Sequence, residues 1–280
     1  MKLVHPLVPA GRLEIRRSPN RGGRTALSAY RPMRLRGRVL SLASRVSVPR
    51  VSLVDATQEE LLLIRAAVPS DADGFCLMRS SAPDRWIVAV SRADALSEVV
   101  KVGSPTDRGL VIEAAMLRDL GHPSGFDVPQ LVSQSVAHGR SVVSTRAVVG
   151  APRRELHVAT RVAVGLANLG LTHGDFAPWN LLGQAPTLID WESAEWTLRP
   201  MYDLCHFVVQ SEALLGRGRV TPVLKALTSR GSAGALYLVQ LGRPLEEAVD
   251  HLVAYLDEAD RRGTFMKSAD LRSRLRTALK

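Results

Sequence analysis

Short apolar runs rich in β-branched residues recur between residues 75 and 146. Each run is four to six residues long, and polar residues, prolines or glycines bound it, as is typical of strands. We expect the runs to form one antiparallel sheet. The predicted strands are residues 75–79, 86–90, 99–102, 129–133 and 141–146.

Two helices are predicted in the same region. Residues 57–67 begin with Thr57 at the N-cap and have Glu60 three residues later, which is the capping-box pattern. Residues 104–121 begin at Ser104, with proline at the next position, and end at Gly121. Both segments carry apolar residues at helical spacing, so we expect each to pack one face against the sheet.

Beyond residue 151 the apolar positions recur with the helical period instead. Residues 147–151 are therefore predicted to be the crossing between a sheet-based and a helical part. The chain is predicted to be of the α+β class. Helices are expected at residues 152–169, from 201 onwards, and at 221–229, 235–241, 244–262 and 268–279.

The segment between the first two of these helices carries the candidate chemistry. It reads His-Gly-Asp-Phe-Ala-Pro-Trp-Asn over residues 173–180, and Ile-Asp-Trp-Glu over 189–192. Phosphoryl transfer from a magnesium nucleotide requires a carboxylate that orients the attacking hydroxyl, and oxygen ligands that hold the metal. Asp175 fits the first task, and Asn180 and Asp190 fit the second. Each of these residues alone is more often structural, and only their joint spacing favours catalysis.

These two motifs resemble the catalytic loop and the metal-binding segment of the aminoglycoside phosphotransferase and choline kinase-like family. The resemblance covers about residues 75–210. It implies a two-lobed protein-kinase-like fold, with a small antiparallel sheet in the N-lobe and a mainly helical C-lobe. It divides the chain into a basic extension (1–50), a nucleotide-binding N-lobe (51–146) and a C-lobe with the catalytic loop and acceptor region (147–280).

The resemblance also implies a role for each site residue. Asp175 would be the catalytic base, and Asn180 and Asp190 the Mg²⁺ ligands. His173 and Asp203 would orient the catalytic loop, although an acid at a helix start also has an ordinary structural explanation. The remaining roles concern ATP. Lys101 would bind its α and β phosphates and would pair with Glu113 rather than Glu98. Ser80 and Ser81 would lie in the loop that covers the phosphates, and residues 146–149 would lie beside the adenine.

The function implied is ATP- and magnesium-dependent transfer of a phosphoryl group to a hydroxyl of a small molecule. An aminoglycoside, choline or sugar-like acceptor would suit the family, and the sequence does not choose among them. Two alternatives stay open. One is a protein kinase, which the HGD motif in place of HRD disfavours. The other is a weakly catalytic binding or scaffold protein, which the glycine-free loop at residues 80–85 favours.

The net charge of +10 is confined to the first fifty residues. They hold twelve Lys and Arg against one acid, Glu14, whereas the other 230 residues hold 25 against 26. Such a segment could bind nucleic acid or an acidic partner. Because no aromatic residues alternate with the arginines, a solvated or loosely docked appendage is the preferred interpretation.

Other features place the chain among globular cytoplasmic proteins. Hydrophobic residues make up 46% of the sequence, and no apolar run is long enough to span a membrane. The N-terminus is a poor signal peptide, because His5, two prolines and Arg12 interrupt it. Cys76 and Cys205 lie far apart without metal or redox spacing, as expected in a reducing compartment. The same lack of ligand spacing favours a core position for His206.

Overall fold

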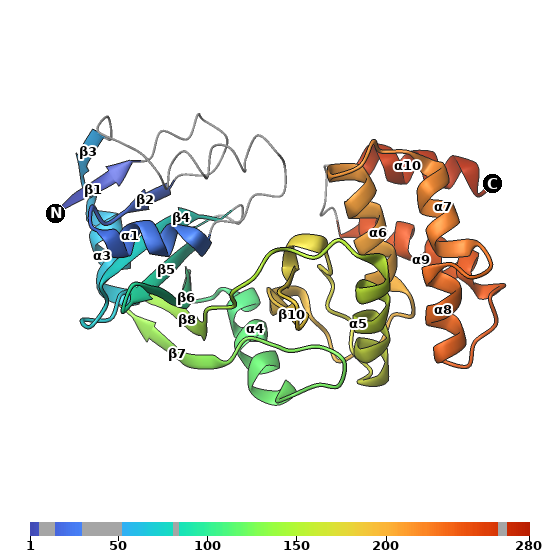
Figure 1. Ribbon diagram of the computed structural model, residues 1–280, viewed down its shortest axis with the longest axis horizontal. Coiled ribbons are helices and arrows are strands. Elements are labelled where there is room, and N and C mark those ends of the chain that lie inside the picture. Colours follow the sequence, from blue (N-terminus) through green and yellow to red (C-terminus); the bar gives the residue numbers. More distant parts are fainter. Residues whose placement is uncertain (6–14, 30–51, 81–83, 263–267) are drawn as a thin grey trace. The chain divides into compact units, whose positions relative to one another are not determined.

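A computed structural model describes residues 1–5, 15–29, 52–80, 84–262 and 268–280. The chain divides into two compact units (Figure 1). Unit 1 comprises residues 1–119 and 129–149, and unit 2 comprises residues 120–128 and 150–280. Unit 1 is built on a sheet and unit 2 is mainly helical. The α+β fold class that the sequence predicts is thus present.

Unit 1 contains one antiparallel sheet of eight described strands, in the order β3-β1-β2-β4-β5-β6-β8-β7. The five predicted strands are all there and lie side by side at one end of the sheet. Their register places Lys101 opposite Ile87 on one side and opposite Val143 on the other. The bounds of the five are β4 (Gly74–Arg79), β5 (Trp86–Arg92), β6 (Ala95–Gly103), β7 (Leu131–Ala137) and β8 (Arg140–Arg146).

Three further strands extend the sheet, and two of them lie in residues 1–50, which were predicted to be a loosely docked appendage. β1 (Lys2–His5) lies between β3 (Ser52–Asp55) and β2 (Ile15–Arg17), and β2 pairs with β4. The described part of the basic segment is therefore built into the sheet. The alternation of Ile15 with Arg16 is typical of a strand, and Ile15, which is 2% exposed, contributes to the core.

Different helices pack on the two faces of the sheet. Helix α3 (Gln58–Ala67) has the predicted capping box, with Thr57 and Glu60 bonded to each other's backbone N–H groups, and packs its Leu63 on one face. Helix α1 (Arg21–Ala26) with the turn η1 (Leu27–Ala29) covers β4 and β5 on the opposite face, through Leu27 against Cys76 and Met78. Helix α4 (Arg108–Leu120) covers β8 on that same face.

Glu98 on β6 links the two strands that pair with β6. It is 6% exposed, accepts hydrogen bonds from Ser144 at 2.7 Å and Arg92 at 2.6 Å, and lies 3.8 Å from Arg146. Burial by itself would raise the pKa of Glu98, but the bonds from Ser144 and Arg92 outweigh it and the pKa lies below the usual value. Glu98 therefore stays charged and joins β5 to β8.

We expect Glu98→Gln to lower the free energy of unfolding by about 1–2 kcal/mol at pH 7, because the substitution removes the charge that strengthens these bonds. A depressed folded pKa gives stability that is present above the unfolded value of about 4.3 and is lost as the pH falls through the folded pKa. The difference between the two proteins should therefore shrink from pH 7 to pH 3 in urea unfolding. As the control, Asp71→Asn removes an exposed partner of Arg92 and should change little. A Glu98→Gln deficit that is equal at both pH values would contradict this.

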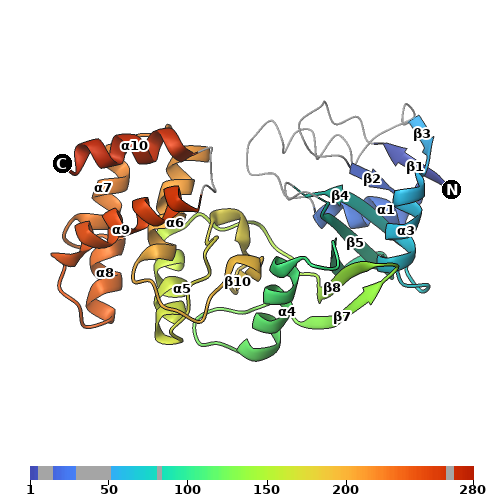
Figure 2. The same cartoon turned by 180° about the vertical axis from the view of Figure 1, so that it is seen from behind.

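Unit 2 is a group of helices around the motif segment. Helix α5 (Leu156–Asn168) packs against α6 (Tyr202–Leu214) and α8 (Ala233–Gln240), and α9 (Glu247–Arg261) contacts α6. Helices α7 (Val220–Thr228) and α10 (Ala269–Ala278) complete the unit. Figure 2 shows the C-terminal α10 across the end of α7. Among the described helices, none is both long and apolar enough to cross a membrane.

Two helices start later than the sequence predicts. α4 begins at Arg108 rather than Ser104, because residues 104–107 form a turn and the Asp107 carboxylate accepts from the N–H of Leu110. α5 begins at Leu156, because Pro152 pairs with Leu182 in a β-bridge. The predicted ends hold: Gly121 and Gly170 adopt positive φ angles of 57° and 70° just after the helices.

Candidate active site

The loop of residues 173–180 is fixed by one buried carboxylate. Asp203 in the first turn of α6 accepts hydrogen bonds from the backbone N–H groups of His173, at 2.8 Å, and Gly174, at 3.0 Å. Gly174 has a φ angle of 81°, and an added Cβ would lie 2.4 Å from the carbonyl oxygen of Ser193, so glycine is required there. Burial raises the pKa of Asp203, and His173 and the two N–H groups oppose that rise. These are the contacts that a loop-anchoring residue needs.

His173 ties the two motifs together. Its ring is fully buried, its Nε2 lies 3.1 Å from the carbonyl oxygen of Ile189, and its Nδ1 lies 3.3 Å from the backbone nitrogen of Asp175. A neutral ring protonated at Nε2 satisfies both contacts, because Nε2 then donates and Nδ1 accepts. Burial lowers the pKa of His173, which favours this neutral form. The ring also packs edge-on against the buried Trp191, at 4.8 Å between centroids.

Asp175 and Asn180 lie in direct contact. The turn η2 (Pro178–Asn180) brings the Asn180 side chain back, and its Nδ2 donates to the carbonyl oxygen of Asp175 at 2.8 Å and to its Oδ2 at 3.1 Å. With the amide nitrogen so engaged, the side-chain oxygen is the atom of Asn180 that can bind a cation. Asn180 is 4% exposed, while the Asp175 side chain is 22% exposed and can meet a substrate.

Asp190 follows a short strand pair, as the sequence predicts. β9 (Leu181–Leu182) pairs with β10 (Thr187–Leu188), and the Ile189 N–H donates to the Asn180 carbonyl oxygen at 2.9 Å, which fixes the spacing of the motifs. Asp190 has the left-handed conformation, with φ 71° and ψ 61°. Such backbone in a non-glycine residue is often found at functional sites. Asp190 and Glu192 each place a carboxylate oxygen within 4.8 Å of the other's, so Glu192 could assist in holding a cation.

In unit 1 the structure pairs Lys101 with Glu113. The Lys101 Nζ lies 2.7 Å from Oε2 and 2.9 Å from Oε1 of Glu113 on α4, and both side chains are largely buried. Glu98, the competing partner, is instead bound to Arg92 and Ser144. The ion pair fixes the ammonium group on the face of the sheet that α1 and α4 also cover.

A half-buried strip accompanies Lys101 on that face. Residues directly opposite one another in an antiparallel pair share a face, so Ile87, Val99 and Thr145 lie on the same side as Lys101. All four are partly exposed, whereas Cys76 and Ala89 under α1 are fully buried. The strip is a flat, mostly apolar surface beside a fixed cation.

The predicted phosphate-covering loop is described at its two ends. The Ser80 N–H donates to the Arg85 carbonyl oxygen at 3.0 Å, and the Arg85 guanidinium binds Asp107, at the start of α4, with two hydrogen bonds of 2.9 and 2.7 Å. The loop is thus anchored to the helix that carries Glu113. Ser81, the second predicted phosphate contact, lies outside the described residues.

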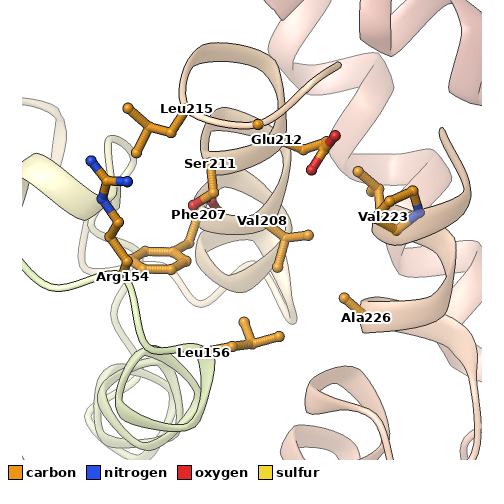
Figure 3. A pocket seen from close by; sticks show the side chains of 11 residues that line it. Arg154, Leu156, Phe207, Val208, Ser211, Glu212, Leu215, Val223 and Ala226 are labelled. Atoms are coloured by element: carbon orange, nitrogen blue, oxygen red, sulfur yellow. The ribbon is translucent and has the colours of Figure 1, made fainter. Parts of the chain in front are cut away.

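A cavity of about 320 Å³ lies within unit 2, between α5, α6 and α7. Figure 3 shows Arg154 and Glu212 on opposite sides of it, with Phe207 and Val208 between them. The Glu212 carboxylate accepts from the backbone N–H groups of Arg217, at 3.1 Å, and Arg219, at 2.9 Å. Its charge therefore holds the loop after α6, and we assign no ligand to this cavity.

No family model and no curated protein matches the sequence. Among solved structures, a thermostable mutant of aminoglycoside phosphotransferase APH(4)-Ia in its apo form aligns over 72% of this chain and 93% of its own, with 13% identity and a TM-score of 0.47. A ternary complex of that phosphotransferase with ADP and hygromycin B aligns over 80% and 98%, with 11% identity and a TM-score of 0.49. WbdD bound to the kinase inhibitor LY294002 aligns over 69% and 49%, with 16% identity and a TM-score of 0.39.

The chain resembles the aminoglycoside phosphotransferases. The structures named above are those of an aminoglycoside phosphotransferase and of WbdD, and each aligns with a TM-score below 0.5.

The sequence did not predict one contact at the loop of residues 173–180. His206 is fully buried, as its preferred core interpretation requires, but its Nε2 also lies 3.2 Å from Oδ1 of Asp175. The sequence offered a weak signal, because His206 stands three residues after Asp203 and so lies on a neighbouring face of the same helix. Only the fold shows that this face of the helix meets the loop that carries Asp175. Cys205, also fully buried, is confined to packing.

Proposed function

We propose that this protein transfers the γ-phosphoryl group of ATP to a hydroxyl group of a small molecule. The observation that carries the proposal is the Asp175–Asn180 pair, which is held in one loop by Asp203 and His173. A partly exposed carboxylate beside a fixed amide is what a base and its neighbouring metal ligand require. Asp175 orients the acceptor hydroxyl and accepts its proton.

Mg²⁺ suits the oxygen atoms present. The side-chain oxygen of Asn180 and the carboxylates of Asp190 and Glu192 are hard donors of the kind that this cation prefers. Asn180 and Asp190 would hold it, with Glu192 in support. The ion, when bound, would neutralise charge on the transferred phosphoryl group.

Unit 1 supplies the features that suit the nucleotide. Lys101 presents an ammonium group fixed by Glu113, which suits the α and β phosphates. The apolar strip of Ile87 and Val99 beside it suits the flat face of a purine. Ser80 and the backbone of its loop would add hydrogen-bond donors to the phosphates.

The proposal is tested by calorimetry and by turnover. Mg-ATP should bind with heat that disappears when the magnesium is removed with EDTA. ADP release should then be measured with aminoglycosides, hygromycin B among them, with choline-like amino alcohols, with sugars, and with water alone as acceptor. Release that depends on a hydroxyl compound supports the proposal. Metal-dependent binding without any turnover would overturn it.

Lys101→Met tests the phosphate contact. We expect Mg-ATP to bind about 10- to 100-fold more weakly, since a charge-assisted hydrogen bond contributes roughly 1.5–3 kcal/mol. The single variant also leaves Glu113 buried without its cation, which destabilises unit 1. The double variant Lys101→Met/Glu113→Met should regain stability in thermal unfolding and still bind Mg-ATP weakly. If the double variant bound like the wild type, Lys101 would have no phosphate contact.

A kinase-like binding or scaffold protein is the second candidate. The observation that favours it is the position of α1 and η1, which cover β4 and β5 on the face that carries Lys101. An occupied face would leave less surface for a nucleotide. In that case calorimetry should show no metal-dependent heat with ATP.

A further inference from the structure

Behind the Asp175 carboxylate lies a buried chain of polar groups from two helices. His206 on α6 places Nε2 at 3.2 Å from Oδ1 of Asp175, and Tyr255 on α9 places its hydroxyl at 3.3 Å from Nδ1 of the same ring. His206 is 0% exposed and Tyr255 is 1% exposed. The carboxylate is thus contacted from inside the protein as well as by Asn180.

The direction of this chain follows from its chemistry. Burial raises the pKa of Tyr255 well above its usual value, so the phenol keeps its proton and can donate. If the phenol donates to Nδ1, a neutral His206 carries its proton on Nε2 and donates it to Asp175. Each of the three groups then has a hydrogen-bond partner, and Asp203 remains occupied with the backbone of the loop.

Packing holds the imidazole in one orientation. Tyr202, one turn before His206 on α6, stacks parallel to its ring, with centroids 6.3 Å apart and an interplanar angle of 5°. Tyr255 meets the same ring edge-on at 6.0 Å and 71°. A ring clamped on its face and its edge cannot turn its Nε2 away from the carboxylate without disturbing both tyrosines.

We infer that His206 is a positioning residue for the proposed phosphoryl transfer, with Tyr255 fixing its tautomer. Its Nε2–H holds Oδ1 of Asp175 while the Asn180 amide holds Oδ2. The carboxylate is therefore fixed at both oxygens, and one lone-pair direction stays aimed at the acceptor hydroxyl. His206 touches neither nucleotide nor acceptor in this role. The inference rests on the proposed function of Asp175.

The test compares His206→Phe, His206→Gln and Tyr255→Phe in the full chain. Turnover of Mg-ATP is measured with the panel compounds above, and with water if no panel compound accepts. His206→Phe keeps the aromatic stack and removes the donor, so kcat should fall roughly 30- to 100-fold, as a misplaced catalytic group implies, with an unchanged KM for ATP. His206→Gln restores an N–H at a similar reach and should recover most of kcat. Tyr255→Phe should cost only about threefold to tenfold, because the ring and its packing stay.

Two controls separate this inference from the proposed function. His157→Gln changes an exposed histidine on α5 and should leave kcat unchanged. In an Asp175→Asn background, His206→Phe should cause no further loss, because the residue acts through that carboxylate. Thermal unfolding and Mg-ATP titration check that each variant is folded.

The outcomes are distinct. If Asp175→Asn loses turnover while folded His206→Phe keeps the wild-type kcat, the positioning role is wrong and the proposed function stands. A further loss in the Asp175→Asn background, or no recovery with His206→Gln, would also overturn the positioning role. Wild-type turnover that is absent, or that Asp175→Asn leaves unchanged, would overturn both.

Discussion

Replacing Asp175 by Asn is expected to reduce turnover of Mg-ATP by about 10²–10⁴-fold, the usual contribution of a positioned general base. Asn has nearly the same shape but no charge, and it cannot accept the proton of the attacking hydroxyl. The loop should keep its form, because Asp203 and His173 hold it through the backbone. Steady-state kinetics measures the loss of turnover, and calorimetry measures the affinity for Mg-ATP separately.

Asp250→Asn is the matched control, since it neutralises an exposed acid on α9 and should leave the rate as it is. Mg-ATP affinity of the Asp175→Asn protein should stay within about threefold of the wild type, because Asn180 and Asp190 are the proposed metal ligands. An Asp175→Asn protein with normal kcat would remove the basis of the proposed function.

Asp203→Ala is the second substitution with a large expected effect. Asp203 is 6% exposed, and its two oxygens accept the N–H groups of His173 and Gly174. Alanine leaves both donors buried without an acceptor, at about 1–3 kcal/mol each. The free energy of unfolding should therefore fall by roughly 2–6 kcal/mol, a large share of the usual 5–15 kcal/mol. Turnover should fall with it, because the loop that carries Asp175 loses its anchor.

Asp203→Asn gives the graded comparison. Its side-chain oxygen can still accept one of the two N–H groups, so its loss of stability in urea unfolding should lie between wild type and Asp203→Ala. If Asp203 were only an ordinary helix-start acid, replacing it would lower the free energy of unfolding by about 0.3–1 kcal/mol. Equal, small losses for both variants would show that Asp203 does not anchor the loop.

The local elements of this protein could be predicted from its sequence. Strands β4 to β8 and the helices of unit 2 follow from the period of the apolar positions, because those periods are set by backbone geometry. The capping box of Thr57 and Glu60 and the glycines that end α4 and α5 depend only on neighbours along the chain. The paired β9 and β10 followed from two short apolar runs between the motifs.

In the N-terminal segment, residues 12–16 alternate like one short strand, but the sequence did not show that this segment joins the sheet. β1 pairs with β3 about fifty residues away, and β2 pairs with β4. Strand pairing of this kind has no local signal, since the hydrogen bonds are made to backbone far along the chain. The start of α4 was missed for a similar reason, because Asp107 binds both the helix and the distant Arg85.

The sequence by itself determined the chemistry that this chain can offer: an acid, an amide and a second acid at fixed spacing, with candidate anchors in His173 and Asp203. The tertiary structure alone decided which of these groups touch. In the folded protein Lys101 pairs with Glu113, while Glu98 binds Arg92 instead. The fold also brings His206 into contact with Asp175, and Tyr255 into contact with His206. The physical reason is that hydrogen bonds and ion pairs act over a few ångströms, and the order of residues along a chain does not fix such distances between helices.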